Sequence, residues 1–172
     1  MTNTVPPTKP PHAAQSLPGR LTRTDDGALA RFDYTGLRAL VVEPDDEARD
    51  AIEGALRSIG IARTFGARSA SHAIEIAADL DLDLMLCDVT LDYPEGDDGL
   101  SFVLDVREDR TPLDEDIPIL FFAGDAGSFS VMEAKRLGVH DFLAKPVPLK
   151  RLESSLQRLM RDQFPTRVQP ST

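Results

Sequence analysis

The chain has 172 residues, 41% of them hydrophobic, and a formal net charge of −10 at pH 7. This length suits one domain with a sizeable core. The apolar runs are much shorter than the roughly 20 residues that a membrane span requires, so we expect no membrane association. The acidic charge argues against broad nucleic-acid binding, which takes clustered Lys and Arg.

Two further features indicate the compartment. The N-terminal segment lacks the apolar stretch of a secretory signal. Cys87 is the single cysteine, so the chain cannot form an internal disulfide. We therefore expect a cytoplasmic protein.

The two ends of the chain differ in composition from its middle. Residues 1–35 are rich in Pro, Thr and Ala, include PPTKPP, and show no clear periodicity. We predict a mostly disordered N-terminal arm, with residues 29–34 as a segment that docks on the domain. The domain itself is predicted over residues 36–164, followed by a flexible tail at 165–172.

From residue 37 onward, short apolar runs alternate with segments of helical period. The runs predict strands at residues 38–43, 61–65, 84–87, 117–122 and 141–144. Helices are predicted from residue 46 to a stop at Gly60, after a Ser69 cap, over 100–107, over 128–137, and after Pro148. The alternation predicts an α/β fold, a doubly wound five-stranded parallel sheet covered on both faces by five helices.

Several chemically useful residues stand where these strands end. Because ligands of such sheets bind beyond the carboxyl ends of the strands, we expect these residues to meet at one edge. They are Glu43, Asp45 and Asp46 after the first strand, Asp88 after the third, Ala123 and Gly124 after the fourth, and Lys145 after the fifth.

This group of side chains suits phosphoryl chemistry with a hard cation. Mg²⁺ is held by one or two carboxylates and keeps several waters. A carboxylate beside such a cation can attack phosphorus, and Lys145 can pair with a phosphoryl oxygen. Taken singly, these residues have plainer interpretations, since Asp45 or Asp46 can cap the first helix.

Three segments, ALVVEPDDEAR, LMLCD and GVHDFLAKPV, occur in this order and spacing. They resemble the receiver domain of bacterial two-component response regulators, over about residues 37–164. The resemblance implies a flavodoxin-like sheet of strand order 2-1-3-4-5. It also implies phosphoryl transfer from a histidine kinase or a histidine phosphotransfer protein.

The resemblance assigns roles residue by residue. It makes Asp88 the phospho-acceptor, and it places Lys145, Thr90 and Gly124 in contact with the phosphoryl group. It gives Mg²⁺ as the cofactor, held by Glu43, Asp88 and the backbone carbonyl of Thr90, with Asp45 as an alternative ligand.

The sequence departs from the family pattern at three places. Pro44 stands where the second acid of the metal-binding pair is expected, which predicts weak Mg²⁺ binding. Ala123 replaces the Ser or Thr of the family's switch, and Phe142 supplies its aromatic partner without a hydroxyl. The loop after Asp88, LDYPEGDDG, is longer than usual and acidic, which favours a solvated loop.

Three classes of function follow. The leading one is a single-domain response regulator that is phosphorylated on Asp88 and signals through protein contacts, with a homodimer left open. The second is a pseudo-receiver that binds partners without phosphorylation, which Pro44 and Ala123 favour. The third, a phosphatase, is rejected because Thr90 stands where the general acid is needed.

Overall fold

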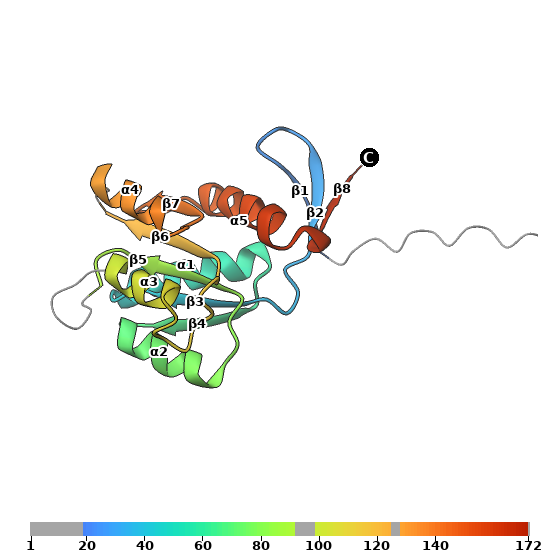
Figure 1. The fold of residues 1–172 in the computed structure, drawn as a ribbon. Coiled ribbons are helices and arrows are strands. Elements are labelled where there is room, and N and C mark those ends of the chain that lie inside the picture. The colour runs from blue at the N-terminus through green and yellow to red at the C-terminus, as the bar shows by residue number, and fades with distance from the viewer. Residues whose placement is uncertain (1–18, 92–98, 125–127, 172) are drawn as a thin grey trace, which may run out of the picture.

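The computed structural model describes residues 19–91, 99–124 and 128–171. Its larger sheet has five parallel strands in the order β4-β3-β5-β6-β7, which is the predicted order 2-1-3-4-5. The strands are β3 (Arg38–Val42), β4 (Arg63–Ala67), β5 (Leu84–Asp88), β6 (Ile119–Ala123) and β7 (Asp141–Ala144). The predicted fold class is confirmed (Figure 1).

Five helices cover the two faces of this sheet. They are α1 (Asp46–Ile59), α2 (Ala70–Asp79), α3 (Gly99–Arg107), α4 (Ser128–Arg136) and α5 (Leu149–Gln163). The buried hydrophobic residues of α1 and α5 belong to one cluster, and those of α2, α3 and α4 belong to the other. The sheet therefore lies as the middle layer of three.

The central strands show why the sheet is parallel and buried. All five residues of β5 and all five of β6 are buried. Successive residues alternate between the two clusters, as with Leu86 in one and Cys87 in the other. Such continuous apolar runs are typical of strands that are covered on both faces.

Local hydrogen bonds set the element boundaries. Asp45 caps α1 by accepting from the Ala48 N–H at 2.8 Å, and Ser69 caps α2. At the other end of α1, the N–H groups of Gly60 and Ile61 both donate to the Leu56 carbonyl. Ile61 therefore belongs to the helix stop, and β4 begins two residues later than the sequence predicts.

A second, smaller sheet joins the two ends of the chain. Strands β1 (Arg20–Arg23) and β2 (Leu29–Phe32) form an antiparallel hairpin, and β8 (Val168–Pro170) pairs with β2 after the short helix η1 (Pro165–Arg167). This small sheet lies beside the C-terminal part of α5 (Figure 1). The docking predicted for residues 29–34 agrees with β2 and its buried side chains. The prediction of a disordered arm is wrong for residues 19–28, and that of a flexible tail is wrong for 165–171.

The physical reason is burial. Ala30, Phe32 and Tyr34 are 4%, 0% and 6% exposed and lie in the same cluster as the core residues of α1 and α5. The folded unit thus extends past both predicted limits of residues 36–164. The predictions for residues 1–18 and for most of the acidic loop after Asp88 lie outside the described residues. No helix in the described part of the chain combines the length and hydropathy of a membrane crossing.

Candidate functional site

Asp88 is the last residue of β5, and its side chain is held from two sides. The residue is 1% exposed. Its Oδ1 accepts hydrogen bonds from the backbone N–H and the hydroxyl of Thr90, each at 2.7 Å. Its Oδ2 accepts from Lys145 Nζ. Every hydrogen bond comes from a residue that the sequence places at this edge of the sheet.

The backbone around Asp88 is equally constrained. The Val89 N–H donates to the Phe122 carbonyl, and the Gly99 N–H donates to the Val89 carbonyl at 2.8 Å. A Cβ at Gly99 would lie 2.4 Å from the Asp88 carbonyl oxygen. A side chain at position 99 would therefore push the start of α3 away from the site.

Glu43 follows β3 directly and is the second buried acid, at 2% exposed. Its Oε1 accepts from the Asp45 backbone N–H at 3.0 Å, and its Oε2 accepts from Lys145 Nζ at 2.7 Å. The Arg49 guanidinium donates to the Glu43 carbonyl at 2.9 Å and holds the turn between β3 and α1. The sequence analysis missed Arg49. The feature that could have indicated it is Asp46, an acid three residues earlier on the same helix with which Arg49 forms an ion pair.

Lys145 follows β7 and bridges the two acids with one ammonium group. Its backbone N–H donates to the Ala123 carbonyl at 2.8 Å, and its peptide bond to Pro146 is cis. The three charged groups carry a net charge of −1 when all are ionised. Two carboxylates and one ammonium thus meet at the carboxyl edge of the sheet, as predicted.

The environment shifts the pKa of each of the three groups. Burial would raise the pKa of Asp88, but hydrogen bonds from Lys145 and Thr90 outweigh it and lower that pKa. Burial dominates at Glu43 and raises its pKa, and the neighbouring Asp88 adds to this. Burial would lower the pKa of Lys145, but the two carboxylates outweigh it and raise that pKa. Of the two carboxylates, Asp88 is therefore the one whose ionised form the site favours.

The structure does not bring Asp45 into this cluster by its side chain. The Asp45 carboxylate is the N-cap of α1, and its exposed neighbour Pro44 supplies no oxygen ligand from its side chain. In the described part of the chain, no group of three or more His, Cys, Asp or Glu side chains is arranged to hold a metal ion. The buried donor set is the pair Glu43 and Asp88.

The residues expected to form a switch lie on the neighbouring strands. Ala123 ends β6 at 1% exposed, and Gly124 follows at the surface. Phe142 is half-buried on β7, with its ring centroid 6.1 Å from that of Phe121. The Ala123 side chain is a methyl group, so it offers no hydrogen bond to a ligand at Asp88.

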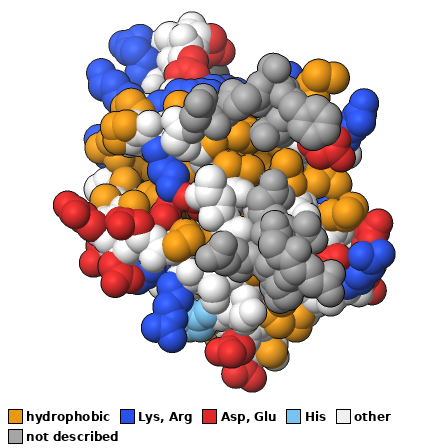
Figure 2. All heavy atoms as spheres, turned by 90° about the vertical axis from the view of Figure 1, so that its left-hand side faces the viewer, with side chains coloured by type: hydrophobic (Ala, Val, Ile, Leu, Met, Phe, Trp, Pro, Cys, Tyr) orange, Lys and Arg blue, Asp and Glu red, His pale blue; other side chains and the backbone are white. Residues whose placement is uncertain are grey.

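An apolar groove of about 170 Å³ adjoins Lys145. It runs between α1 and the segment that joins β7 to α5, and Ala51 at its rim is exposed. The sequence analysis missed this surface, although three alanines at helical spacing on α1 signal it. The lining residues are Ala48, Ala51, Ile52, Ala55, Lys145, Pro146, Val147 and Leu152. Figure 2 faces the carboxyl edge of the sheet, where hydrophobic and acidic side chains both reach the surface.

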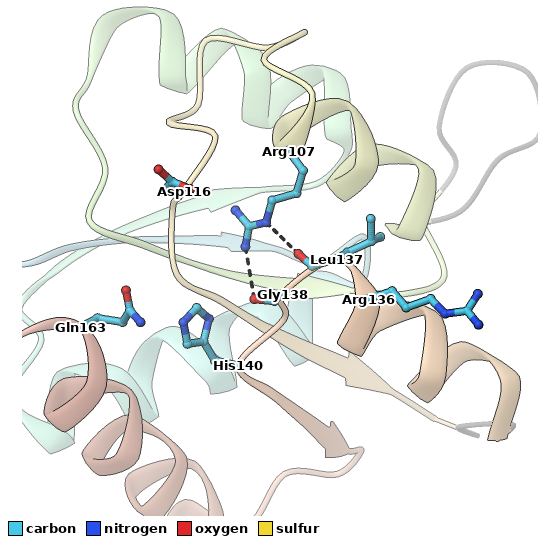
Figure 3. Close-up of a pocket in the computed structure, with 7 residues that line it drawn as sticks. All are labelled: Arg107, Asp116, Arg136, Leu137, Gly138, His140 and Gln163. Atoms are coloured by element: carbon cyan, nitrogen blue, oxygen red, sulfur yellow. Dashed lines mark hydrogen bonds between the residues drawn. The ribbon is translucent and has the colours of Figure 1, made fainter.

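A larger hollow, of about 630 Å³, is lined by neither Glu43 nor Asp88 (Figure 3). Arg107 lines it and donates to the carbonyls of Leu137 and Ile117 at 2.8 and 2.9 Å. His140, on the same wall, accepts from the Ile119 N–H through Nδ1 at 3.2 Å. Arg107 and His140 thus use their polar atoms to hold the backbone near the starts of β6 and β7. Their role is structural, and we do not assign a second reactive site to this hollow.

The fold and this arrangement of acids and lysine are those of a signalling receiver. The family model for the response regulator receiver domain matches residues 39–157, and the chain belongs to that family, in which receivers are modules of two-component systems. The predicted family is thereby confirmed.

Individual relatives agree with this assignment. The chain is 31% identical over 136 residues to the Regulator of RpoS of Escherichia coli K12, covering 78% of this chain and 38% of that protein. The chain therefore spans well under half the length of this curated relative. A response regulator receiver protein from Pseudomonas putida superposes with a TM-score of 0.62 at 28% identity, covering 71% of this chain and 96% of the other. The chemotaxis response regulator CheY4 of Vibrio cholerae gives 0.62 at 25%, covering 73% and 99%.

Proposed function

We propose that this receiver accepts a phosphoryl group on Asp88 and signals through protein–protein contacts. The observation that carries the proposal is the state of Asp88 itself. It is a buried, strand-end carboxylate that Lys145 and Thr90 keep ionised and oriented. The second buried acid, Glu43, supports this proposal. Two neighbouring buried carboxylates repel each other and so destabilise the fold, which is not expected if Asp88 served the fold alone.

The transfer proceeds by attack of an Asp88 oxygen on the phosphorus of a phosphohistidine. A new O–P bond forms as the P–N bond breaks, and the imidazole nitrogen takes the electron pair of the broken bond. Lys145 occupies Oδ2 in this structure, so it moves from the carboxylate to a phosphoryl oxygen during transfer. In this proposal the Thr90 N–H stays on Oδ1, and Thr90 Oγ1 turns from Oδ1 to contact the phosphoryl group together with the Gly124 backbone N–H.

Mg²⁺ is the proposed cofactor, and the donor chemistry fits it. Two buried carboxylates with water suffice for this ion. Glu43, Asp88 and the backbone carbonyl of Thr90 would hold it, and the ion would offset the charge repulsion between Asp88 and the incoming phosphoryl group. Because the Asp45 carboxylate caps α1 and the Pro44 side chain has no ligand atom, this set is small, and we expect weak binding.

The groove beside Lys145 is the proposed contact surface for the phosphodonor. Its small, apolar rim on α1 allows a helix of a histidine kinase or a phosphotransfer protein to approach closely. Lys145 lines this groove and also donates to Asp88, so in this proposal a histidine on that helix approaches Asp88 past Lys145. In this proposal the groove selects the phosphodonor and also positions its histidine near Asp88.

A pseudo-receiver, which binds its partner without phosphorylation, is the second candidate. It is favoured by Ala123, whose methyl group leaves the usual coupling to the outer surface without a hydrogen bond. An apolar hollow of about 370 Å³ between α4 and β7, lined in part by Val131, Ala134 and Phe142, exists in the unphosphorylated chain. A partner that fills this hollow would bind equally well before and after phosphorylation.

The test is incubation with acetyl phosphate and Mg²⁺, followed by intact-mass measurement. We expect one phosphoryl group on the wild-type chain, none on Asp88→Asn, and the wild-type result for Asp81→Asn, which changes an exposed acid near the start of β5. Equal modification of the wild type and Asp88→Asn would contradict the proposal. An unmodified wild type would favour the pseudo-receiver.

A further inference from the structure

The small sheet has one buried and one exposed face. Ala30 and Phe32 are buried, whereas Leu21 and Leu29 on the opposite face are 44% and 39% exposed. In the strand register, Leu21 lies opposite Arg31 and Arg23 lies opposite Leu29. The four side chains Leu21, Arg23, Leu29 and Arg31 alternate on one surface, which we call the Leu/Arg face.

The charge of the Leu/Arg face is uncompensated within the described residues. Arg23 and Arg31 donate to the backbone carbonyls of Gly27 and Gly19 at 2.7 and 2.8 Å, and neither forms an ion pair with a described carboxylate. The acids of the hairpin are engaged elsewhere. Asp25 bonds to Ser154 and Arg158, Asp26 to Thr24, and Asp33 to the Thr35 N–H and Arg167.

Strand β1 is also an edge. The order of the small sheet is β1-β2-β8, so no described strand pairs with the outer side of β1. All but one of its residues are exposed. An edge strand offers backbone hydrogen bonds to an added strand, and this gives affinity where the side-chain surface is small.

We propose that β1 and the Leu/Arg face bind an extended segment of a partner protein in which acidic and apolar residues alternate. Added beside β1, such a segment would place every second side chain on the Leu/Arg face. An apolar side chain would then contact Leu21, and a carboxylate would pair with Arg23. This binding goes beyond phosphoryl transfer and is independent of it, since the small sheet contacts neither Asp88 nor Lys145 through any hydrogen bond of the described residues.

Charge distinguishes this partner from other occupants. Pairing β1 with β1 of a second copy about a two-fold axis would place the two Leu/Arg faces side by side, so that Arg23 and Arg31 of both copies would gather on one surface without carboxylates. An anionic membrane or a nucleic acid needs more clustered basic residues than the two arginines, Arg23 and Arg31, of this face. A partner strand with alternating acidic residues would instead place its carboxylates next to Arg23 and Arg31, so we favour this occupant.

The test selects binders to the whole chain from a displayed library of random peptides. We expect the enriched peptides to alternate Asp or Glu with apolar residues. A synthetic copy should bind the wild type about tenfold more tightly than it binds Arg23→Glu/Arg31→Glu. Arg63→Glu is the control, because it reverses an exposed charge at the start of β4.

Unfolding in urea establishes that each variant is folded, and Leu21→Ser/Leu29→Ser should also weaken binding. Enriched peptides without an acidic bias would overturn the proposal. So would equal losses in Arg63→Glu and the double variant. Arginine-dependent binding to phosphatidylserine vesicles, without binding to any acidic peptide, would overturn it in favour of a membrane.

Discussion

The two sheets of this molecule are assembled from the chain in different ways. The five-stranded sheet takes its strands from one continuous stretch, each joined to the next through a helix. The small sheet joins residues 20–32 to residues 168–170, across nearly the whole chain. The first arrangement brings strand ends together and forms the site around Asp88. The second ties residues 20–32 and 168–170 to the core and leaves one of its faces exposed within the described part of the chain.

The largest loss of stability should come from a change at Phe32, which is a residue of the small sheet and packs in the core of the five-stranded sheet. Its ring is fully buried in the cluster that contains α1 and α5, and Arg161 lies 5.7 Å from its centroid. We expect Phe32→Ala to lower the free energy of unfolding by about 3–5 kcal/mol, because it leaves a cavity. Denaturation in urea measures this.

Leu29→Ala, also on β2 but exposed, is the matched control and should cost less than about 0.5 kcal/mol. A single cooperative transition is expected in each variant. If Phe32→Ala behaved like Leu29→Ala, the small sheet would be an attachment rather than part of the domain.

The next effect concerns Lys145 in the other region. Lys145→Met leaves two buried carboxylates without their shared ammonium. We expect a loss of about 2–3 kcal/mol, reduced from the cost for a wholly buried pair because the Lys145 side chain is 25% exposed. Thermal unfolding measures it, and Lys135→Met on α4 is the exposed control.

Mg²⁺ sharpens this prediction. A cation that binds between Glu43 and Asp88 should raise the melting temperature of Lys145→Met more than that of the wild type, since it replaces the missing positive charge. An equal rise in both proteins would argue that Mg²⁺ binds elsewhere.

The same contrast explains what the sequence could predict. The parallel sheet was predictable because apolar runs such as LMLCD are continuous and helical segments separate them. The convergence of Glu43, Asp88 and Lys145 followed from the topology alone, because parallel strands end at one edge. The sequence did not predict how the side chains are oriented. It left open whether Asp45 caps a helix or binds a metal, and it did not show that Lys145 bonds to both Glu43 and Asp88.

The small sheet was not predictable in the same way. Its strands have three or four residues, and β2 pairs with a segment that begins more than 130 residues later. A strand this short gives a weak periodic signal, and a partner so distant gives no local one. The proline-rich composition of residues 1–18 also led us to extend the predicted disorder as far as residue 28, with only residues 29–34 docking on the domain.

A smaller effect is expected at Asp141, which connects β7 to α5. Burial would raise the pKa of Asp141, but hydrogen bonds from Ser155, the Phe142 N–H and Arg158 outweigh it and lower that pKa below its ordinary value of 3.8. The carboxylate therefore stabilises the fold above that ordinary value, and the contribution is lost as the pH falls through the lowered pKa.

Asp141→Asn should accordingly cost about 1–2 kcal/mol at neutral pH, and the difference from the wild type should shrink as the pH falls below about 4. Urea unfolding at several pH values measures it, with the exposed Asp50→Asn on α1 as control. A difference that is constant over this range would assign the loss to packing instead of charge.

The smallest effect is at the contact between the hairpin and α5. Asp25 accepts from Arg158 at 3.1 Å and from Ser154 at 2.7 Å, and Arg158 also bonds to Asp141. The Asp25 and Arg158 side chains are 62% and 44% exposed, so solvent screens their attraction. A double-mutant cycle of Asp25→Asn and Arg158→Gln should give a coupling energy of about 0.2–1 kcal/mol that falls in high salt. A coupling as large as the loss in Phe32→Ala would mean that charge, rather than the burial of Phe32, attaches the hairpin. The burial of Phe32 and the exposure of both charged side chains argue for the opposite order.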